Sequence, residues 1–471
     1  MSVPDVILTV RDGSLGVIPP LATGTCLKIG TCQLGTVNTI YSFSDPQLAV
    51  TTLGQGPLTE AVVRSLGIGG GPVLAIPANP TTAGSAGAVT KNGTGLSVIT
   101  VAGAANDAYS VAILITAGGV NPAGGTATFQ YSLDGGTTWS PVTSVPVSGT
   151  YVIPNSGLTL TFSAATLVAA DTYTFVCTSP GFSLSDLNAA LTAALASSYS
   201  FGFVHVVGPA STAAGAAAMA AAVDVQMSTA AVSKRFIWGI IEVPQDTDAN
   251  IMTAFANTAS TRVMAAAGFA VVASAINGRQ LSRSAGWVLA ERTAAVTMGT
   301  DLGRVKDGSL PGVVSISRDE RATPALDNAR LATLRTIIGR QGFYINNGRM
   351  LSPAGSDYQL AQYRRIIDAF STICYTALLN FLNDSVTVDA TTGYILEASA
   401  QNIEAYVGEQ AKSVITRPGE ASSLTITVNR ATNIISTGTL PVSGRVVPNG
   451  YNKSITADIG LSNPALTLKA A

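Results

Sequence analysis

The spacing of apolar residues changes along the chain, and this change constrains the fold more than any other feature. Within residues 96–178, apolar positions alternate with small or polar ones, as in the segments 109–115 and 158–162. Alternation with a period of two is typical of strands that bury one face. The turn Asp134-Gly135-Gly136 has the composition of a hairpin connection. We therefore expect residues 84–180 to form an all-β sandwich or barrel module.

Strands and helices alternate after this stretch. The strands are expected at 201–207, 236–243 and 269–275, and the helices at 186–197, 212–227 and 247–266. This order is typical of an α/β sheet covered by helices. Residues 23–83 also mix short strands and helices. We therefore expect residues 23–83 and 181–341 to form one α/β domain, into which the all-β module is inserted.

The last quarter of the chain has a third character. Apolar residues at helical spacing predict a long helix over residues 358–382 and a second helix over 398–415. Alternating strands follow. We expect a C-terminal α+β domain at 342–437 and extended arms at both ends, residues 1–22 and 438–471. The chain is thus predicted to be a multidomain protein of the α+β or α/β class.

Charge is scarce, and its balance argues against several functions. Only 11% of the residues are charged, and Ala, Gly, Ser and Thr are abundant. Small residues suit surfaces that neighbouring subunits cover; the alternative is an ordinary monomer with an uncharged surface. A net charge of −1 argues against direct nucleic-acid binding, which needs a basic surface. The apolar stretches are short and no secretory signal is visible, so we expect synthesis in the cytoplasm and no membrane insertion.

The residue types that catalysis requires do not come together in the sequence. His205, the single histidine, lies inside an apolar run and is expected in the core. One histidine and unsuitable cysteine spacing argue against a zinc site. The segment 67–72 lacks the Lys-Ser/Thr of a phosphate loop, and Asp246-Thr247-Asp248 fits a helix N-cap better than a calcium loop. We predict no enzyme activity, no cofactor, and no catalytic or metal-binding residues.

The four cysteines are expected to be free thiols. Cys26 and Cys32 are six positions apart, so a continuous strand would place them on one face about 20 Å apart. They could bond only to other partners, and the alternative is an inter-subunit disulfide through Cys26 or Cys32. Cys177 and Cys374 are expected to be inert core thiols.

Several segments in the last third of the chain carry a resemblance to a known family. They are GFYINNGRM at 342–350, SDY at 356–358, YRRIID at 363–368 and TTGYI at 391–395. Their order resembles that of contractile bacteriophage tail sheath proteins. The resemblance implies a structural subunit that assembles as a helical stack of hexameric rings around a tail tube. Contraction of the stack would drive the tube through the host envelope.

The resemblance also implies partners and a location. The partners are further copies of the chain, the tail tube protein, and the baseplate and tail terminator proteins. The location is the virion tail, after synthesis in the host bacterial cytoplasm. Two other functions stay open: another repetitive viral coat or surface-layer protein, or a glycan-binding adhesin.

Terminal arms of sheath proteins donate strands to neighbouring subunits, and the resemblance implies this role for both ends of the chain. The residues on the donated strands would be Val6, Leu8 and Val10 in the first arm and Ile455, Ala457 and Ile459 in the second. We expect the second segment to form a hairpin with residues 445–447 through the turn Asn449-Gly450.

Sheath contact with the tube must hold before contraction and release during it, which suits exposed charge pairs. Arg364 and Arg365 on the long helix, and Glu404 and Glu409 on the second helix, are expected to be exposed. These four residues are candidates for the tube contact. The alternative is that they only solvate the two helices.

Overall fold

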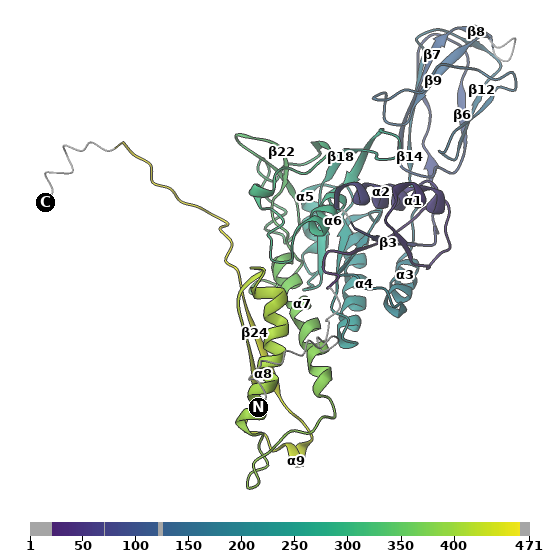
Figure 1. Ribbon diagram of the computed structural model, residues 1–471. Helices are drawn as coiled ribbons and strands as arrows, with labels where there is room; N and C mark the ends of the chain where they lie inside the picture. Colours follow the sequence, from purple (N-terminus) through teal and green to yellow (C-terminus); the bar gives the residue numbers. More distant parts are fainter. Residues whose placement is uncertain (1–20, 70, 121–125, 462–471) are drawn as a thin grey trace, which may run out of the picture.

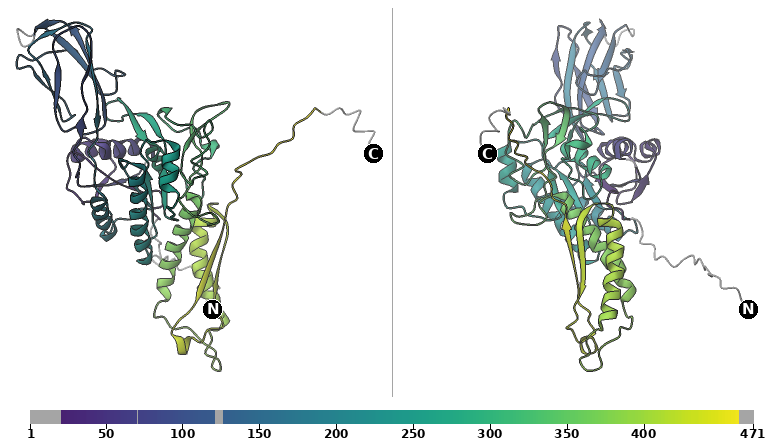
Figure 2. Two further views of the ribbon diagram at one scale, coloured as in Figure 1. Left: turned by 180° about the vertical axis from the view of Figure 1, so that it is seen from behind. Right: turned by 60° about the vertical axis from the view of Figure 1, so that its left-hand side comes forward.

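The molecule is elongated, with three parts in a row (Figure 1). The computed structural model describes residues 21–69, 71–120 and 126–461. A module of strands stands at one end, a sheet with helices on both faces lies in the middle, and two long helices with a hairpin form the other end. Two further views show the same arrangement (Figure 2). The mixed α/β, multidomain fold expected from the sequence is confirmed.

The central sheet has six strands in the order β17-β16-β15-β1-β3-β2. Their bounds are β1 Cys26–Gly30, β2 Tyr41–Phe43, β3 Val73–Pro77, β15 Phe203–Val206, β16 Trp238–Glu242 and β17 Val263–Ala266. All pair in parallel except β2, which is antiparallel to β3. Strand β1 lies between β3 and β15, with Cys26 opposite Phe203. The sheet therefore combines strands from before and after the stretch of alternating apolar residues.

Helices cover both faces of this sheet, and its inner strands are buried along their length. One face packs against α3 Leu184–Ala196, α4 Ala213–Val232 and α5 Asp248–Phe255, and the other packs against α2 Pro57–Gly69 and α6 Ala285–Ala295. A further short helix, α1 Pro46–Leu53, packs on α2. The Thr247 hydroxyl accepts a hydrogen bond from the Asn250 amide at the start of α5, so the predicted N-cap is confirmed.

Helix α4 is long and apolar enough, by length and composition, to span a membrane. It buries Met219, Val223 and Met227 against the sheet, as a core helix does. One stripe of its apolar residues therefore packs within the chain, while others, such as Val225 and Val232, are exposed.

The module at one end of the molecule contains only strands and turns among its described residues. Its strands are β4 Ser85–Ala86, β5 Thr90–Asn92, β6 Ile99–Gly103, β7 Tyr109–Ala117, β8 Gly119–Val120, β9 Thr128–Ser132, β10 Thr143–Ser144, β11 Thr150–Ile153, β12 Leu158–Phe162, β13 Thr166–Leu167 and β14 Thr172–Thr178. One sheet has the order β10-β9-β7-β14-β4 and another the order β11-β12-β6. Alternate side chains such as Ile113, Phe129 and Leu160 enclose one core. We call this part the β module.

Two small groups of strands lie beside the central sheet. They are β18 Phe269–Ala273, β19 Gln280–Ser284 and β20 Val313–Ile316 in one sheet, and β21 Leu334–Ile337 with β22 Arg340–Ile345 in another. Strand β18 pairs with both β19 and β20. Strand β19 continues directly into α6, and its Arg283 contacts Asp107 of the β module.

The C-terminal part consists of two helices and a hairpin. The elements are α7 Ala361–Leu378, α8 Glu397–Ala411, β23 Ala421–Val428, the short α9 Ile434–Thr437, and β24 Val442–Pro448. Helix α7 packs on α8 and β24, and α8 packs on β23. The two predicted helices are thus present.

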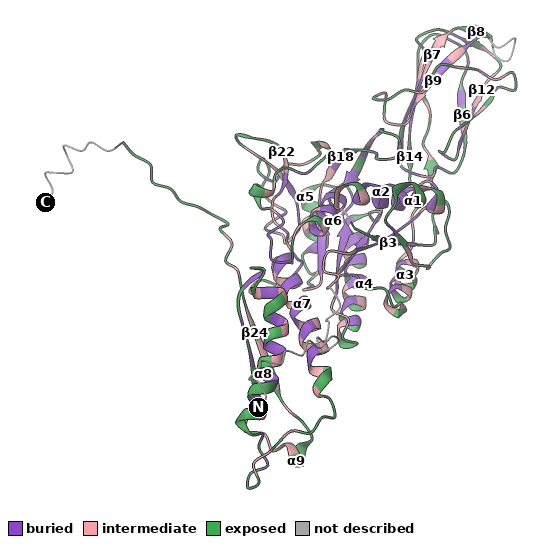
Figure 3. Ribbon diagram, in the orientation of Figure 1, coloured by how far each residue is buried: buried purple, intermediate pink, exposed green. Residues whose placement is uncertain are grey.

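One predicted pairing in this part is wrong. Strand β24 pairs with β23, with Val442 opposite Val428, and not with the residues that follow Asn449-Gly450. Strand β23 presents Leu424, Ile426 and Val428 to the helices, so β24 completes a hairpin over an apolar surface. Residues 454–461 have no such surface and run away from the molecule, exposed along their length (Figure 3).

Candidate functional site

The C-terminal arm exposes apolar side chains that nothing in the described chain covers. Residues 454–461 belong to no helix or strand. Ile455 is 80% exposed and Ile459 is 90% exposed. Large apolar side chains in such an arm are unfavourable in water unless another surface covers them. The arm is therefore a candidate contact segment, as predicted for Ile455, Ala457 and Ile459.

Two residues hold the start of this arm against the body of the molecule. The Tyr451 hydroxyl donates to the Gly299 carbonyl at 2.7 Å, and its ring lies 5.6 Å from the ring of Tyr363. The Lys453 ammonium donates to Asn347 Oδ1 at 2.7 Å and forms an ion pair with Asp301. The arm is thus fixed up to Lys453 and free afterwards. Sequence reasoning missed this anchor, although both residues lie within the expected arm, residues 438–471.

The hairpin β23–β24 offers edges to which a strand could add. Each strand has one partner among the described residues, so each keeps an edge whose backbone groups face away from the hairpin. Such an edge is a template for pairing with another chain. A two-stranded hairpin with unpaired edges and an exposed extended segment therefore occur in the same molecule.

The expected exposure of Arg364 and Arg365 is wrong, because both residues are buried, at 5% and 2% exposed. The Arg365 guanidinium donates to the carbonyls of Thr297 and Val296 at 3.0 and 2.9 Å. Burial lowers the pKa of Arg365 to about 10. Arg364 forms an ion pair with Asp368. The segment directly after α6 packs over this edge of α7. The spacing of apolar residues within α7 cannot show that a segment distant in the sequence covers its polar edge.

The two glutamates on α8 differ in their surroundings. Glu404 accepts from the Val428 amide at 2.7 Å and pairs with Arg430 at 2.6 Å, so it fixes the end of β23. Glu409 is exposed and pairs with Lys412 at 3.6 Å and with Arg417 at 2.5 Å. Of the four predicted tube contacts, Glu409 alone is exposed, and its two ion-pair partners are exposed as well.

The two N-terminal cysteines also differ. Cys26 is buried in β1 between two strands, and burial raises its pKa to about 11. The Cys26 thiol is thus enclosed within the subunit, and of the two candidates for an inter-subunit disulfide Cys32 is the more accessible. Cys32 is only partly covered; its thiol donates to the Leu34 carbonyl at 2.9 Å, and burial raises its pKa to about 12. Cys177 is buried as predicted, and Cys374 is partly buried against the C-terminal core.

His205 is in the core, as predicted, and belongs to a row of polar side chains across three strands. Its Nδ1 lies 3.1 Å from the Lys28 ammonium and its Nε2 lies 3.0 Å from Glu242 Oε1. All three side chains are buried. Burial lowers the pKa of His205 and raises that of Glu242 to about 7.

Helix α6 packs directly against Glu242 and His205 of this row. A Cβ atom at Gly286 would lie 2.9 Å from Glu242 Cγ and 3.1 Å from His205 Nε2. The helix backbone therefore covers these groups directly, and a substrate has no path to them. The row is part of the core. Lys28 and Glu242 were missed from sequence, although each is a charged residue inside an apolar strand.

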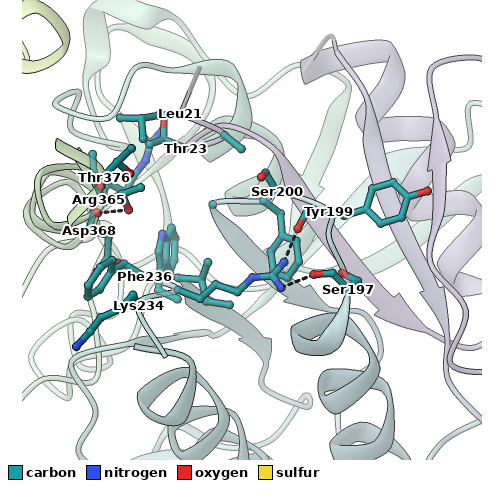
Figure 4. A pocket seen from close by; sticks show the side chains of 18 of the residues that line it. Leu21, Thr23, Ser197, Tyr199, Ser200, Lys234, Phe236, Arg365, Asp368 and Thr376 are labelled. Carbon is teal, nitrogen blue, oxygen red and sulfur yellow. Dashed lines mark hydrogen bonds between the residues drawn. The ribbon is translucent and has the colours of Figure 1, made fainter. Parts of the chain in front are cut away.

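A pocket lies where the first described residues meet α7 (Figure 4). The segments that line it include residues 21–23, 197–202, 234–238 and the α7 side chains from Arg365 to Thr376. Arg235 donates to the carbonyls of Leu195 and Ser197, both at 2.9 Å, and lies over the ring of Phe201. Arg235, Arg365 and Asp368 are held by contacts within the chain, and the exposed Lys234 also lines the pocket. The strand predicted to carry Val6, Leu8 and Val10 lies outside the described residues.

The sequence matches two domains of one family. Residues 3–349 match the family described as DUF2586, N-terminal domain, and residues 357–466 match DUF2586, C-terminal domain. No curated protein sequence matches the chain.

Solved structures of contractile assemblies have a similar fold. A chain of an extracellular contractile injection system, the PVC sheath complex in its contracted state, is 10% identical with a TM-score of 0.56, covering 98% of each chain. A chain of the anti-feeding prophage baseplate in the contracted state is 13% identical with a TM-score of 0.55, and one of its contracted helical sheath is 11% identical with a TM-score of 0.53. Both comparisons cover 98% of this chain and all of the other. The resemblance to contractile tail sheath proteins is confirmed in the fold.

Proposed function

Because the chain belongs to the DUF2586 family and has the sheath fold along nearly its whole length, we propose that it is the structural subunit of a contractile tail sheath. One observation supports this most directly: an exposed apolar arm, anchored at Tyr451 and Lys453, occurs in the same molecule as the hairpin β23–β24. The role is mechanical, and no enzyme activity is proposed.

The arm has the dimensions of a donated strand. Residues 454–461, when extended, reach about 26 Å. This length is similar to that of β24, which has 7 residues. Backbone hydrogen bonds to the hairpin of a neighbouring subunit would satisfy the groups of the arm, and its apolar side chains would be covered there. The N-terminal arm is proposed as a second donor.

Strand exchange of this kind links subunits without fixing their relative orientation, because the arm can rotate about the residues that precede it. We propose stacked hexameric rings around a tail tube, with contraction as a rigid-body rearrangement of linked subunits that drives the tube through a host envelope. The proposed partners are the tail tube, baseplate and terminator proteins. The proposed location is the tail of a phage or a phage-like particle made in a bacterial cytoplasm.

The experiment uses the alternation of side chains along an extended arm. Ile455 and Ile459 share one face, and Thr456 lies on the opposite face. The double variant Ile455→Asp/Ile459→Asp should remain in small species, whereas the matched control Thr456→Asp should assemble like the unmodified chain. Negative-stain microscopy and sedimentation velocity distinguish the two. Equal assembly of both variants would contradict strand donation, and an unmodified chain that never forms helical tubes would contradict the sheath role itself.

A further inference from the structure

The contact between the β module and the rest of the molecule is ionic and buried. Asp107, in the loop between β6 and β7, is 1% exposed. It accepts hydrogen bonds from Arg279 at 2.6 Å and from Arg283 at 2.5 Å. Arg279 directly precedes β19 and Arg283 lies within it. We call the central sheet, its helices and the strands β18 to β22 beside it the central part. A carboxylate of the β module thus lies between two guanidinium groups of the central part.

The two arginines are held from the other side by the central part. The Arg279 guanidinium lies 3.4 Å from Glu60 Oε1 on α2, and Ser274 donates to both oxygens of Glu60 at 2.9 Å. The guanidinium of Arg283 lies over the ring of Trp287 on α6, 5.0 Å from its centroid. Two cations and two carboxylates therefore balance, and their positions are set by elements from both parts of the molecule.

A second carboxylate of the β module holds the same strand. Asp134 Oδ1 accepts from the amides of Thr137 and Thr138 at 3.1 and 2.8 Å, which fixes the turn. Its Oδ2 accepts from the Gln280 amide at the start of β19, at 3.0 Å. Asp107 and Asp134 thus contact β19 at neighbouring positions.

The third carboxylate of the β module faces inward. Asp171 accepts from the amides of Thr94 and Gly95, both at 2.9 Å, within the β module itself. It is buried like Asp107 but does not contact the central part in the structure. Asp171 is therefore a natural control for the effect of losing a buried carboxylate.

The chain crosses between the two parts along two adjacent segments. Thr82 and Gly181 exchange backbone hydrogen bonds at 3.0 and 2.9 Å, and the Thr31 hydroxyl donates to the Pro180 carbonyl at 3.0 Å. A single crossing point of this kind would act as a hinge. The contacts of Asp107 and Asp134 with β19 provide a second point of attachment.

We propose that Asp107 and Asp134, by binding Arg279, Arg283 and the amide of Gln280, lock the β module to the central part so that the two move as one rigid body. Losing one partner of a buried ion pair leaves an uncompensated charge, so the lock opens only at a large cost. The proximity of two guanidinium groups holds the pKa of Asp107 below its usual value although the residue is buried. The lock is a property of the single subunit and is independent of the proposed sheath role. In any assembly, the β module would follow every rotation of the central part.

The lock predicts where amide hydrogen exchange changes in the full-length chain. Asp107→Asn should raise exchange in residues 104–109 and 279–284 by at least about tenfold, with little change in β12 and β14. The control Asp171→Asn should raise exchange around residues 93–96 and leave 279–284 unchanged. Unchanged exchange at 279–284 in Asp107→Asn would overturn the proposal.

If Asp107→Asn raises exchange throughout the chain, the variant is unfolded and does not test the lock. X-ray scattering of the unmodified monomer then tests whether the β module and the central part move as one rigid body. A rigid lock requires that one conformation fits the scattering curve. A curve that requires an ensemble with variable angles between the β module and the central part would overturn the proposal.

Discussion

The Nε2 atom of His205 lies 3.0 Å from Oε1 of Glu242, on the neighbouring strand of the central sheet. The opposite ring nitrogen lies 3.1 Å from the ammonium of Lys28. A lysine ammonium can only donate, so Nδ1 accepts and Nε2–H donates to the carboxylate. The row thus fixes the tautomer of His205, and it makes stability depend on pH through Glu242.

Replacement of Glu242 by Gln should change how stability depends on pH. Burial raises the pKa of Glu242 from 4.5 to about 7, so the folded chain binds a proton that the unfolded chain releases between these values. The free energy of unfolding of the unmodified chain should therefore increase, relative to Glu242→Gln, as pH falls from 8.5 to 6. The expected gain is about 1 kcal/mol. The opposing contribution of His205 is common to both proteins. Parallel pH profiles from denaturant titrations would contradict the prediction.

Replacement of Gly286 by Ala should destabilise the chain, because the new methyl group would press on Glu242 and His205. We expect a loss of about 1–3 kcal/mol in the free energy of unfolding. The control is Gly408→Ala in α8, where a Cβ atom would meet nothing within 4 Å. This change should be neutral or stabilising by up to about 1 kcal/mol, because Ala favours helix. Equal effects of the two changes would show that α6 does not seal the row.

Oxidised particles should cross-link through Cys32 and not through Cys26. Cys32 is partly exposed, whereas Cys26 is enclosed between two strands. Non-reducing gels should show dimers of the unmodified chain and of Cys26→Ser, and none of Cys32→Ser. Dimers that persist in Cys32→Ser would assign the cross-link to another thiol.

Charge reversal on α8 should separate a surface role from a structural one. Glu409→Lys should leave the free energy of unfolding within about 0.5 kcal/mol of the unmodified value and weaken assembly on tubes in a salt-dependent way. Glu404→Lys should destabilise the subunit itself, because the Val428 amide would lose its acceptor and Arg430 would keep only Glu397 of its two carboxylate partners. Thermal unfolding and co-sedimentation with tube protein measure the two effects. Unchanged binding of Glu409→Lys to tubes would remove this residue from the contact.

Features that depend on neighbours a few positions away could be predicted from the order of residues. The alternation of apolar residues located the strands of the β module, the helical spacing located α7 and α8, and the composition at Thr247 located an N-cap. The placement of His205 in the core followed from its apolar neighbours. Local backbone geometry imposes these periods on side chains, so they can be read from the order of residues.

The tertiary structure alone decided which charges are exposed and which strands pair. Arg365 is covered by the carbonyls of Val296 and Thr297, almost seventy positions earlier in the chain, and the row from Lys28 to Glu242 spans three strands that are distant in sequence. The choice of β23 as the partner of β24 depends on the apolar surface of two helices. Burial and pairing are set by what packs against a segment from elsewhere in the chain, and a local pattern carries no information about that contact.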